Sequence, residues 1–223
     1  MNQRRQQSLP APIIYSDPIT ARVRFAELRL TPEELWAGFN FGLGERRNLT
    51  ANDPPWLWGI LTSGKVTRGL RDQLVQNGWT IANYLNYATV VHPDGLLQIA
   101  VSSADGDAGN PYGNPSTRAE KGIATELAVQ VNQAGFHSIL PDDFPAPKRR
   151  MPTYLFLYHV DDIVSRASAE LALPIGISED GLIREWQERI PLFPLDLDGG
   201  QRLRDGTEDG GEDIHIEVER RAS

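Results

Sequence analysis

The chain of 223 residues contains no cysteine, which excludes disulfide bonds, thiolate metal ligands and a cysteine nucleophile. A chain without disulfides suits a reducing compartment, so we expect a cytoplasmic protein. The sequence also lacks any run of 18 apolar residues, and no apolar stretch follows the two arginines near its N-terminus. We therefore expect neither a membrane span nor a secretory signal.

Positive charge is in short supply. The 22 Lys and Arg residues are outnumbered by 30 Asp and Glu residues, and the formal net charge is −8. Residues 198–223 hold eight acidic and four basic side chains, so this segment alone contributes −4 and the body of the protein is mildly acidic. Binding along a nucleic-acid backbone depends on a concentrated Lys/Arg surface, so direct nucleic-acid binding is not expected.

The best-known catalytic signatures are missing as well. The chain has no Walker phosphate-binding pattern, no dinucleotide-binding G-x-G-x-x-G and no G-x-S-x-G nucleophile elbow. Only four histidines are present, which gives a serine triad little support. These absences favour a protein that is not an enzyme of an established sequence class.

The apolar pattern that is present predicts a single α+β domain over residues 13–197. Alternating or apolar runs predict strands at 21–30, 153–160, 165–177 and 181–193, and 3.6-residue periodicity predicts helices at 32–39, 63–79 and 117–135. His92-Pro93-Asp94-Gly95 is typical of a type I turn within a β-hairpin. We expect an antiparallel β-meander sheet with two to three helices on one face.

Two helix starts carry the spacing of a capping box. Thr31 is followed three residues later by Glu34, and Thr117 is followed in the same way by Glu120. Residues 40–59, rich in Gly, Asn and Pro, are expected to be irregular, and the four prolines of 140–152 indicate a connector.

Residues 198–223 are predicted to form a disordered acidic tail, because Gly, Asp and Glu dominate its first part and little apolar surface is available for burial. The tail ends in DIHIEVER, residues 213–220, in which apolar and polar side chains alternate as in a strand. Such a peptide could add to a sheet edge, in this molecule or in a partner. A frayed terminus is the alternative.

The loop at 104–116 has the order used by many anion sites: a strand, a glycine-rich turn and a helix start. Thr117 and Lys121 are placed at that helix start, while Asp105 and Asp107 would repel a bare phosphate. The carboxylates favour a hard cation, Mg²⁺ or Ca²⁺, as the cofactor. A calcium loop would have Glu at its twelfth position, where this chain has Ser116. The alternative is an exposed loop whose Asp, Asn and Gly residues serve turn geometry.

Two metal centres can be imagined from the sequence. In the first, Asp105, Asp107 and Glu170 hold a metal ion and Lys121 orients water or a phosphate, although the strand signature of nucleases, an acidic residue, one spacer and Lys, is absent. In the second, the His-x-Asp elements at 92–94 and 159–161 converge on Zn²⁺, Mn²⁺ or Fe²⁺.

These observations leave two hypotheses of different classes. The first is a non-enzymatic intracellular accessory or regulatory protein that acts through protein–protein contacts, with a partner bound by the C-terminal tail. The second is a metal-dependent phosphate-ester hydrolase or nuclease whose site is the loop 104–116 and the helix after it.

Overall fold

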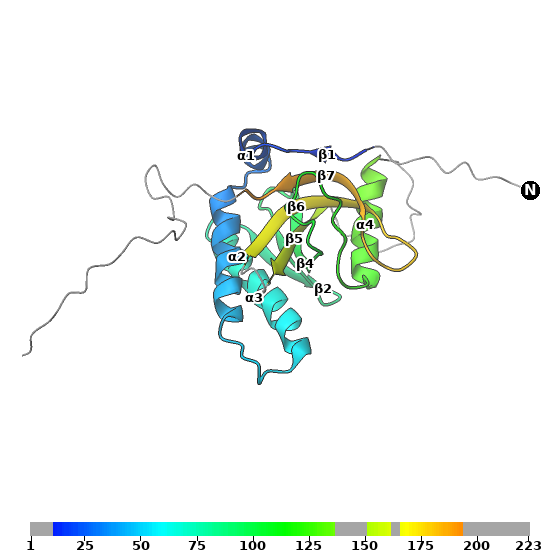
Figure 1. Cartoon of the computed structure of the whole chain (residues 1–223). Coiled ribbons are helices and arrows are strands. Elements are labelled where there is room, and N and C mark those ends of the chain that lie inside the picture. The colour runs from blue at the N-terminus through cyan, green and yellow to red at the C-terminus, as the bar shows by residue number, and fades with distance from the viewer. Residues whose placement is uncertain (1–10, 137–150, 162–165, 194–223) are drawn as a thin grey trace, which may run out of the picture.

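The computed structural model describes residues 11–136, 151–161 and 166–193 (Figure 1). The helices are α1 (Pro18–Glu27), α2 (Pro32–Arg46), α3 (Pro55–Val75) and α4 (Ile123–Phe136). The strands are β1 (Ile13–Ile14), β2 (Thr80–Tyr84), β3 (Tyr87–Val91), β4 (Gln98–Ser103), β5 (Thr153–Asp161), β6 (Arg166–Gly176) and β7 (Glu185–Pro191). The predicted tail at 198–223 and most of the predicted connector at 140–152 lie outside the described residues.

The strands form one seven-stranded sheet in the order β1-β7-β6-β5-β4-β3-β2. The α+β class is confirmed, but the sheet is mixed rather than a purely antiparallel meander. Two antiparallel meanders, β2-β3-β4 and β5-β6-β7, are joined by a parallel pairing of β4 with β5, and β1 pairs with β7 in parallel. The β4–β5 connection crosses over through α4, because parallel neighbours cannot be joined by a tight turn.

Helices cover both faces of the sheet, not one face as predicted (Figure 1). On one face α1, α2 and α3 pack against alternate sheet residues such as Phe156 and Leu171. On the other face α4 and the loop after β4 cover Leu155, Leu157 and Ala172. Successive side chains of a strand point to opposite faces of the sheet, so strands covered on both faces bury residues at every position.

Residues 21–30, predicted as a strand, belong largely to helix α1. Asp17 caps the helix by accepting hydrogen bonds from the backbone N–H groups of Ile19 and Thr20, and Pro18 occupies the first helical position. Ala21 and Phe25, four residues apart, are its buried positions. Over so short a segment, the apolar residues fit the two-residue period of a strand as well as the 3.6-residue period of a helix. The Asp17 cap favours the helix.

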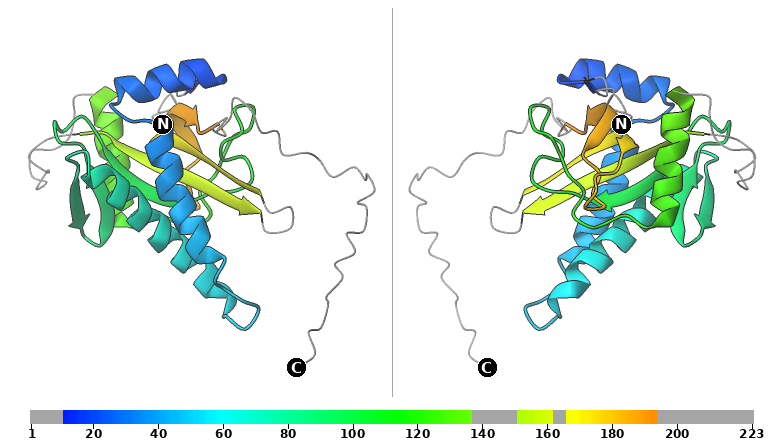
Figure 2. Two further views of the ribbon diagram at one scale, coloured as in Figure 1. Left: turned by 90° about the vertical axis from the view of Figure 1, so that its left-hand side faces the viewer. Right: turned by 90° about the vertical axis from the view of Figure 1, so that its right-hand side faces the viewer.

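Helices α2 and α3 form a close-packed pair that extends beyond the sheet (Figure 2). The capping box of Thr31 and Glu34 is confirmed at the start of α2. Both helices are longer than predicted and take up much of the segment 40–59 that was expected to be irregular. They approach so closely because Gly38 of α2 meets Gly69 of α3 without side chains between them.

The predicted β-hairpin is confirmed between β3 and β4. The backbone N–H of Gly95 donates to the carbonyl of His92 at 2.9 Å, as the predicted turn requires. The three strands predicted in the second half of the chain are also present, as β5, β6 and β7. In the described part of the chain, no helix combines the length and the apolar character that crossing a membrane requires.

Candidate functional site

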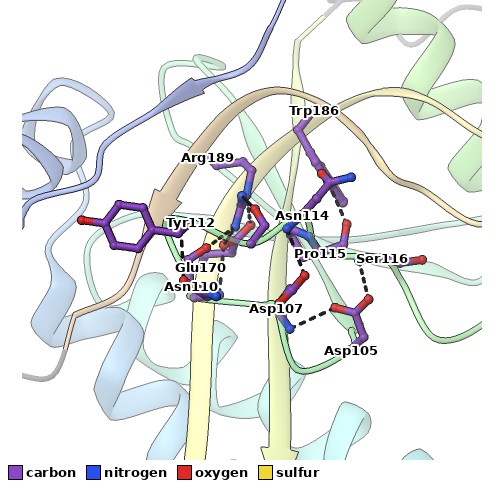
Figure 3. A network of polar contacts seen from close by, with 12 residues as sticks. Asp105, Asp107, Asn110, Tyr112, Asn114, Pro115, Ser116, Glu170, Trp186 and Arg189 are labelled. Atoms are coloured by element: carbon purple, nitrogen blue, oxygen red, sulfur yellow. Dashed lines mark hydrogen bonds and ion pairs between the residues drawn. The ribbon is translucent and has the colours of Figure 1, made fainter.

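The loop after β4, predicted as a ligand site, is tied together by its own acidic side chains (Figure 3). The Asp105 carboxylate accepts hydrogen bonds from the backbone N–H groups of Asp107, at 3.2 Å, and Ser116, at 3.1 Å. The Asp107 carboxylate accepts one from the backbone N–H of Asn114 at 3.0 Å. The two carboxylates thus close the loop upon itself.

The loop is anchored to the sheet by a buried ion pair between Glu170 of β6 and Arg189 of β7 (Figure 3). Both side chains are almost completely shielded from solvent, with exposures of 0% and 1%. The pair is bidentate: Arg189 donates to the two Glu170 oxygens at 2.9 and 2.7 Å. This geometry is among the stronger hydrogen-bonding arrangements in proteins.

Both members of this ion pair also form hydrogen bonds with the backbone of the loop. Arg189 donates to the carbonyl oxygens of Gly113, at 2.6 Å, and Asn110, at 3.0 Å. Glu170 accepts from the backbone N–H of Gly109 at 3.0 Å. The charges of Glu170 and Arg189 therefore hold loop and sheet together, which is a structural role.

The structure does not assemble the predicted metal ligands. Among residues 11–136, 151–161 and 166–193, no three His, Asp or Glu side chains are grouped so that they could hold a metal ion. Glu170 is paired with Arg189 rather than grouped with Asp105 and Asp107. The donor atoms that Mg²⁺ or Ca²⁺ would need are engaged by backbone N–H groups and by a guanidinium.

Thr117 and Lys121 precede helix α4 instead of beginning it. Thr117 is buried, forms an isolated β-bridge with Ala104, and its hydroxyl accepts a hydrogen bond from the backbone N–H of Ile183 at 3.0 Å. The capping box predicted at Thr117 is therefore wrong, since α4 begins at Ile123. Thr117 instead connects the loop to the segment before β7 through its hydrogen bond with Ile183.

The Lys121 ammonium is largely removed from solvent. Its Nζ donates to the Ser102 hydroxyl at 2.8 Å, and burial lowers the pKa of Lys121 to about 8. No carboxylate partner for this ammonium occurs in the described residues. Desolvation of an ammonium without a counter-charge favours its neutral form.

This burial predicts a pH-dependent stability. Because the pKa of Lys121 is lower in the folded protein than its ordinary value of 10.5, the unfolded chain binds more protons between pH 8 and 10.5. The free energy of unfolding should therefore rise by up to about 3 kcal/mol over this interval, relative to a Lys121→Met variant. Urea denaturation of both proteins at pH 7 to 10.5 measures the difference, and a difference that stays constant would contradict the burial of a charged Lys121.

The two His-x-Asp elements do not converge. His92 is buried in the β3–β4 turn, where its Nδ1 accepts from the backbone N–H of Asp94 at 3.0 Å. His159 lies near the end of β5, with its Nδ1 3.2 Å from the carbonyl oxygen of Ala104. In the parallel β4–β5 register the turn with His92 precedes the first pair and His159 follows the last, so the histidines lie at opposite ends of the sheet.

Strand β2 forms an exposed edge of the sheet in the described part of the chain. It ends the sheet, and no other described strand pairs with its outer side. Its sequence, TIANY, has no charged residue and no proline, and its register with β3 has no bulge. Ile81 and Tyr84 expose 54% and 59% of their surface, although they are large and apolar or aromatic. Edge strands of monomeric proteins are usually protected by charge, proline, bulges or shortness.

The pairing pattern shows which backbone groups of β2 point outward. Leu85 and Asn86 have φ values of 49° and 61° and form a two-residue turn, so the flanking pair Tyr84–Tyr87 exchanges hydrogen bonds. Bonded and non-bonded pairs alternate along an antiparallel ladder. The N–H and C=O groups of Ile81 and Asn83 therefore face away from the sheet.

Arg71 of α3 places a positive charge beside this edge. Its guanidinium donates to the carbonyl oxygens of Ala82, at 2.8 Å, and Thr89, at 3.0 Å, and to the Asn83 side chain. Burial lowers the pKa of Arg71, and its Nε is buried without a hydrogen-bond partner among the described residues. No carboxylate of the described chain pairs with it.

Sequence reasoning missed Arg189, Ser102 and the β2 edge. The segment 181–193 holds four charged residues, so charge alone did not single out Arg189 as the buried one. The uncharged run of 80–84 was the signal for the edge, but its place at the end of the sheet depends on the tertiary pairing.

Comparisons with protein-family models, with curated proteins and with solved structures found no match.

Proposed function

We propose that this protein is a cytoplasmic accessory or regulatory protein that works through protein–protein contacts, and that it makes these contacts by strand pairing. Two elements can take part: the open side of β2 and the strand-like segment 213–220 of the acidic tail. The observation that carries the proposal is the unprotected edge at β2, with outward-facing backbone groups at Ile81 and Asn83 and exposed side chains at Ile81 and Tyr84.

Strand addition fits this edge because the backbone groups supply affinity and the side chains on alternate positions supply specificity. Ile81 lies on the face of α3, since its cross-strand partner Val90 packs with the α1–α3 core. Tyr84 lies on the face of α4, since its partner Tyr87 packs with the second core. A partner strand therefore meets one exposed hydrophobic contact on each face.

The hydrolase alternative has less support from the geometry. Asp105 and Asp107 accept hydrogen bonds from loop backbone groups, and Glu170 is neutralised by Arg189. The Lys121 ammonium donates to the Ser102 hydroxyl rather than to either aspartate. The side chains that would bind the metal are already used to build the loop.

A photo-crosslinking amino acid placed at position 84 tests the proposed function. In cells that naturally produce the protein, irradiation should join position 84 covalently to another polypeptide. Position 112 is the matched control, because Tyr112 is also an aromatic residue and is 90% exposed, but lies on the loop after β4 and not on a strand. Adducts at 112 equal to those at 84, or no adduct with another chain at 84, would contradict the proposal.

A further inference from the structure

We propose that, in the free protein, residues 213–220 pair with the open side of β2 as an antiparallel strand, so that the tail occupies the protein's own partner-binding edge. This inference rests on the proposed function of β2 and adds its regulation: a partner gains access only when the tail segment leaves. It joins two observations, an unprotected edge strand and an alternating peptide at the end of the chain.

The linker is long enough to reach the edge. The described chain ends at Phe193 after β7, and the position beyond β2 lies six strand spacings away, roughly 29 Å at about 4.8 Å each. Asp213 follows Phe193 by 20 positions, and a Gly-rich linker of that length has a root-mean-square span of about 25 Å and a maximum of about 66 Å. The required distance is close to the typical span.

The direction of pairing follows from the sheet. β7, β5, β4 and β2 all run the same way, as their parallel and antiparallel pairings require. The chain therefore leaves β7 at the same end of the sheet where β2 ends at Tyr84. A segment that arrives at this end and runs along the edge lies antiparallel to β2, which is also the slightly more stable arrangement.

Charge determines which side of the segment faces α3. Arg71 stands on the α3 face beside β2 and has no carboxylate partner in the described residues. Three of the four odd-numbered positions of the segment are acidic, namely Asp213, Glu217 and Glu219, and the fourth is His215. The even-numbered positions 214, 216 and 218 are Ile, Ile and Val. With the acidic side facing Arg71, the three apolar side chains lie on the side of Tyr84.

Tethering and net charge favour the chain's own tail over a second copy as the occupant. Ile81 and Asn83 offer four outward backbone groups, so a strand that pairs with them gains few hydrogen bonds. A tethered segment needs less binding energy, because a short flexible linker gives an effective concentration in the millimolar range. Two β2 strands would also bring together two copies of a chain of net charge −8.

Amide hydrogen exchange of the full chain, measured by NMR, tests the inference. The N–H groups of Ile81 and Asn83 should be protected in the unaltered protein. Glu217→Pro removes a backbone N–H that faces β2, because the odd-numbered residues lie on the same face as Ile81 and Asn83 and pair directly with them. Exchange at Ile81 and Asn83 should therefore become at least about tenfold faster. Thr207→Pro, within the linker, is the control and should leave both rates unchanged. The amide of Val90, which faces β4, reports that the body remains folded in both variants.

Unprotected amides at Ile81 and Asn83 in the unaltered protein would overturn the inference. Protection that survives Glu217→Pro would overturn it as well, and so would protection that appears only as protein concentration rises, since that identifies a second copy as the occupant. The proposed function fails separately: tail-dependent protection without adducts to another chain at position 84 refutes partner binding and leaves the intramolecular pairing intact.

Discussion

Replacing Glu170 with glutamine is expected to lower the free energy of unfolding by about 3–5 kcal/mol, the usual effect of removing one member of a buried ion pair. The Arg189 guanidinium, 1% exposed, would keep its charge without a compensating carboxylate. It cannot turn to solvent without giving up the carbonyl groups of Asn110 and Gly113, so the loop would loosen with it. Urea denaturation of the variant and the unaltered protein measures the loss.

The double variant Glu170→Leu with Arg189→Met separates charge from shape. Removing both charges eliminates the unpaired cation, so the double variant should be more stable than the single one. It should not regain full stability, because the loop carbonyls and the Gly109 N–H lose their partners. If Glu170→Gln costs less than about 1 kcal/mol, the anchoring role is refuted and Glu170 is free to act as a ligand.

Gly69→Ala should destabilise the protein by about 3 kcal/mol, because it inserts a methyl group between two helix backbones. A Cβ at Gly69 would overlap the carbonyl oxygen of Gly38 and lie 3.0 Å from its carbonyl carbon. These are backbone atoms of α2, which cannot turn aside as a flexible side chain could. The helices must separate, and Val66 and Leu70 then lose contacts in the core.

Gly64→Ala in the same helix is the matched control. A Cβ there meets nothing within 4 Å, so the substitution only restricts the unfolded chain and should stabilise the protein by about 0.5–1 kcal/mol. Thermal and urea denaturation of the two variants should therefore shift in opposite directions. Equal shifts would show that α2 and α3 do not meet at these glycines.

Local chemistry made part of the fold predictable from the sequence. The Thr31–Glu34 capping box and the His92–Gly95 turn depend on residues within four positions of one another, and both were found where the pattern placed them. The strands β5, β6 and β7 were also recognised from their own sequence. In each case the signal and the structure lie in the same short segment.

The features that the sequence did not predict depend on contacts between residues that are far apart in the chain. Thr117 and Glu120 have the spacing of a capping box, but Thr117 is needed as a bridge to Ala104 and Ile183, so the helix begins later. From the sequence, Glu170 was a candidate metal ligand. In the structure it pairs with Arg189, which lies 19 positions away. No local pattern encodes such a pairing.

Composition alone could not decide the role of the loop 104–116, for a related reason. Asp, Asn and Gly are used both to bind ions and to shape turns, so the composition of residues 104–116 fits either purpose. Three-dimensional contacts decide, and Asp105 and Asp107 bond to the backbone of their own loop. The β2 edge, by contrast, has little motif character and is recognised only by its position in the sheet.

The amide exchange rates of Gly109 and Ser116, measured with and without Mg²⁺ or Ca²⁺, test most directly whether the acidic side chains serve the fold. These N–H groups donate to Glu170 and Asp105. We predict slow exchange in the absence of divalent cations and no change when millimolar cation is added. Fast exchange that becomes slow when the cation is added would show that the carboxylates form an ion site, and would contradict a purely structural role for Asp105 and Glu170.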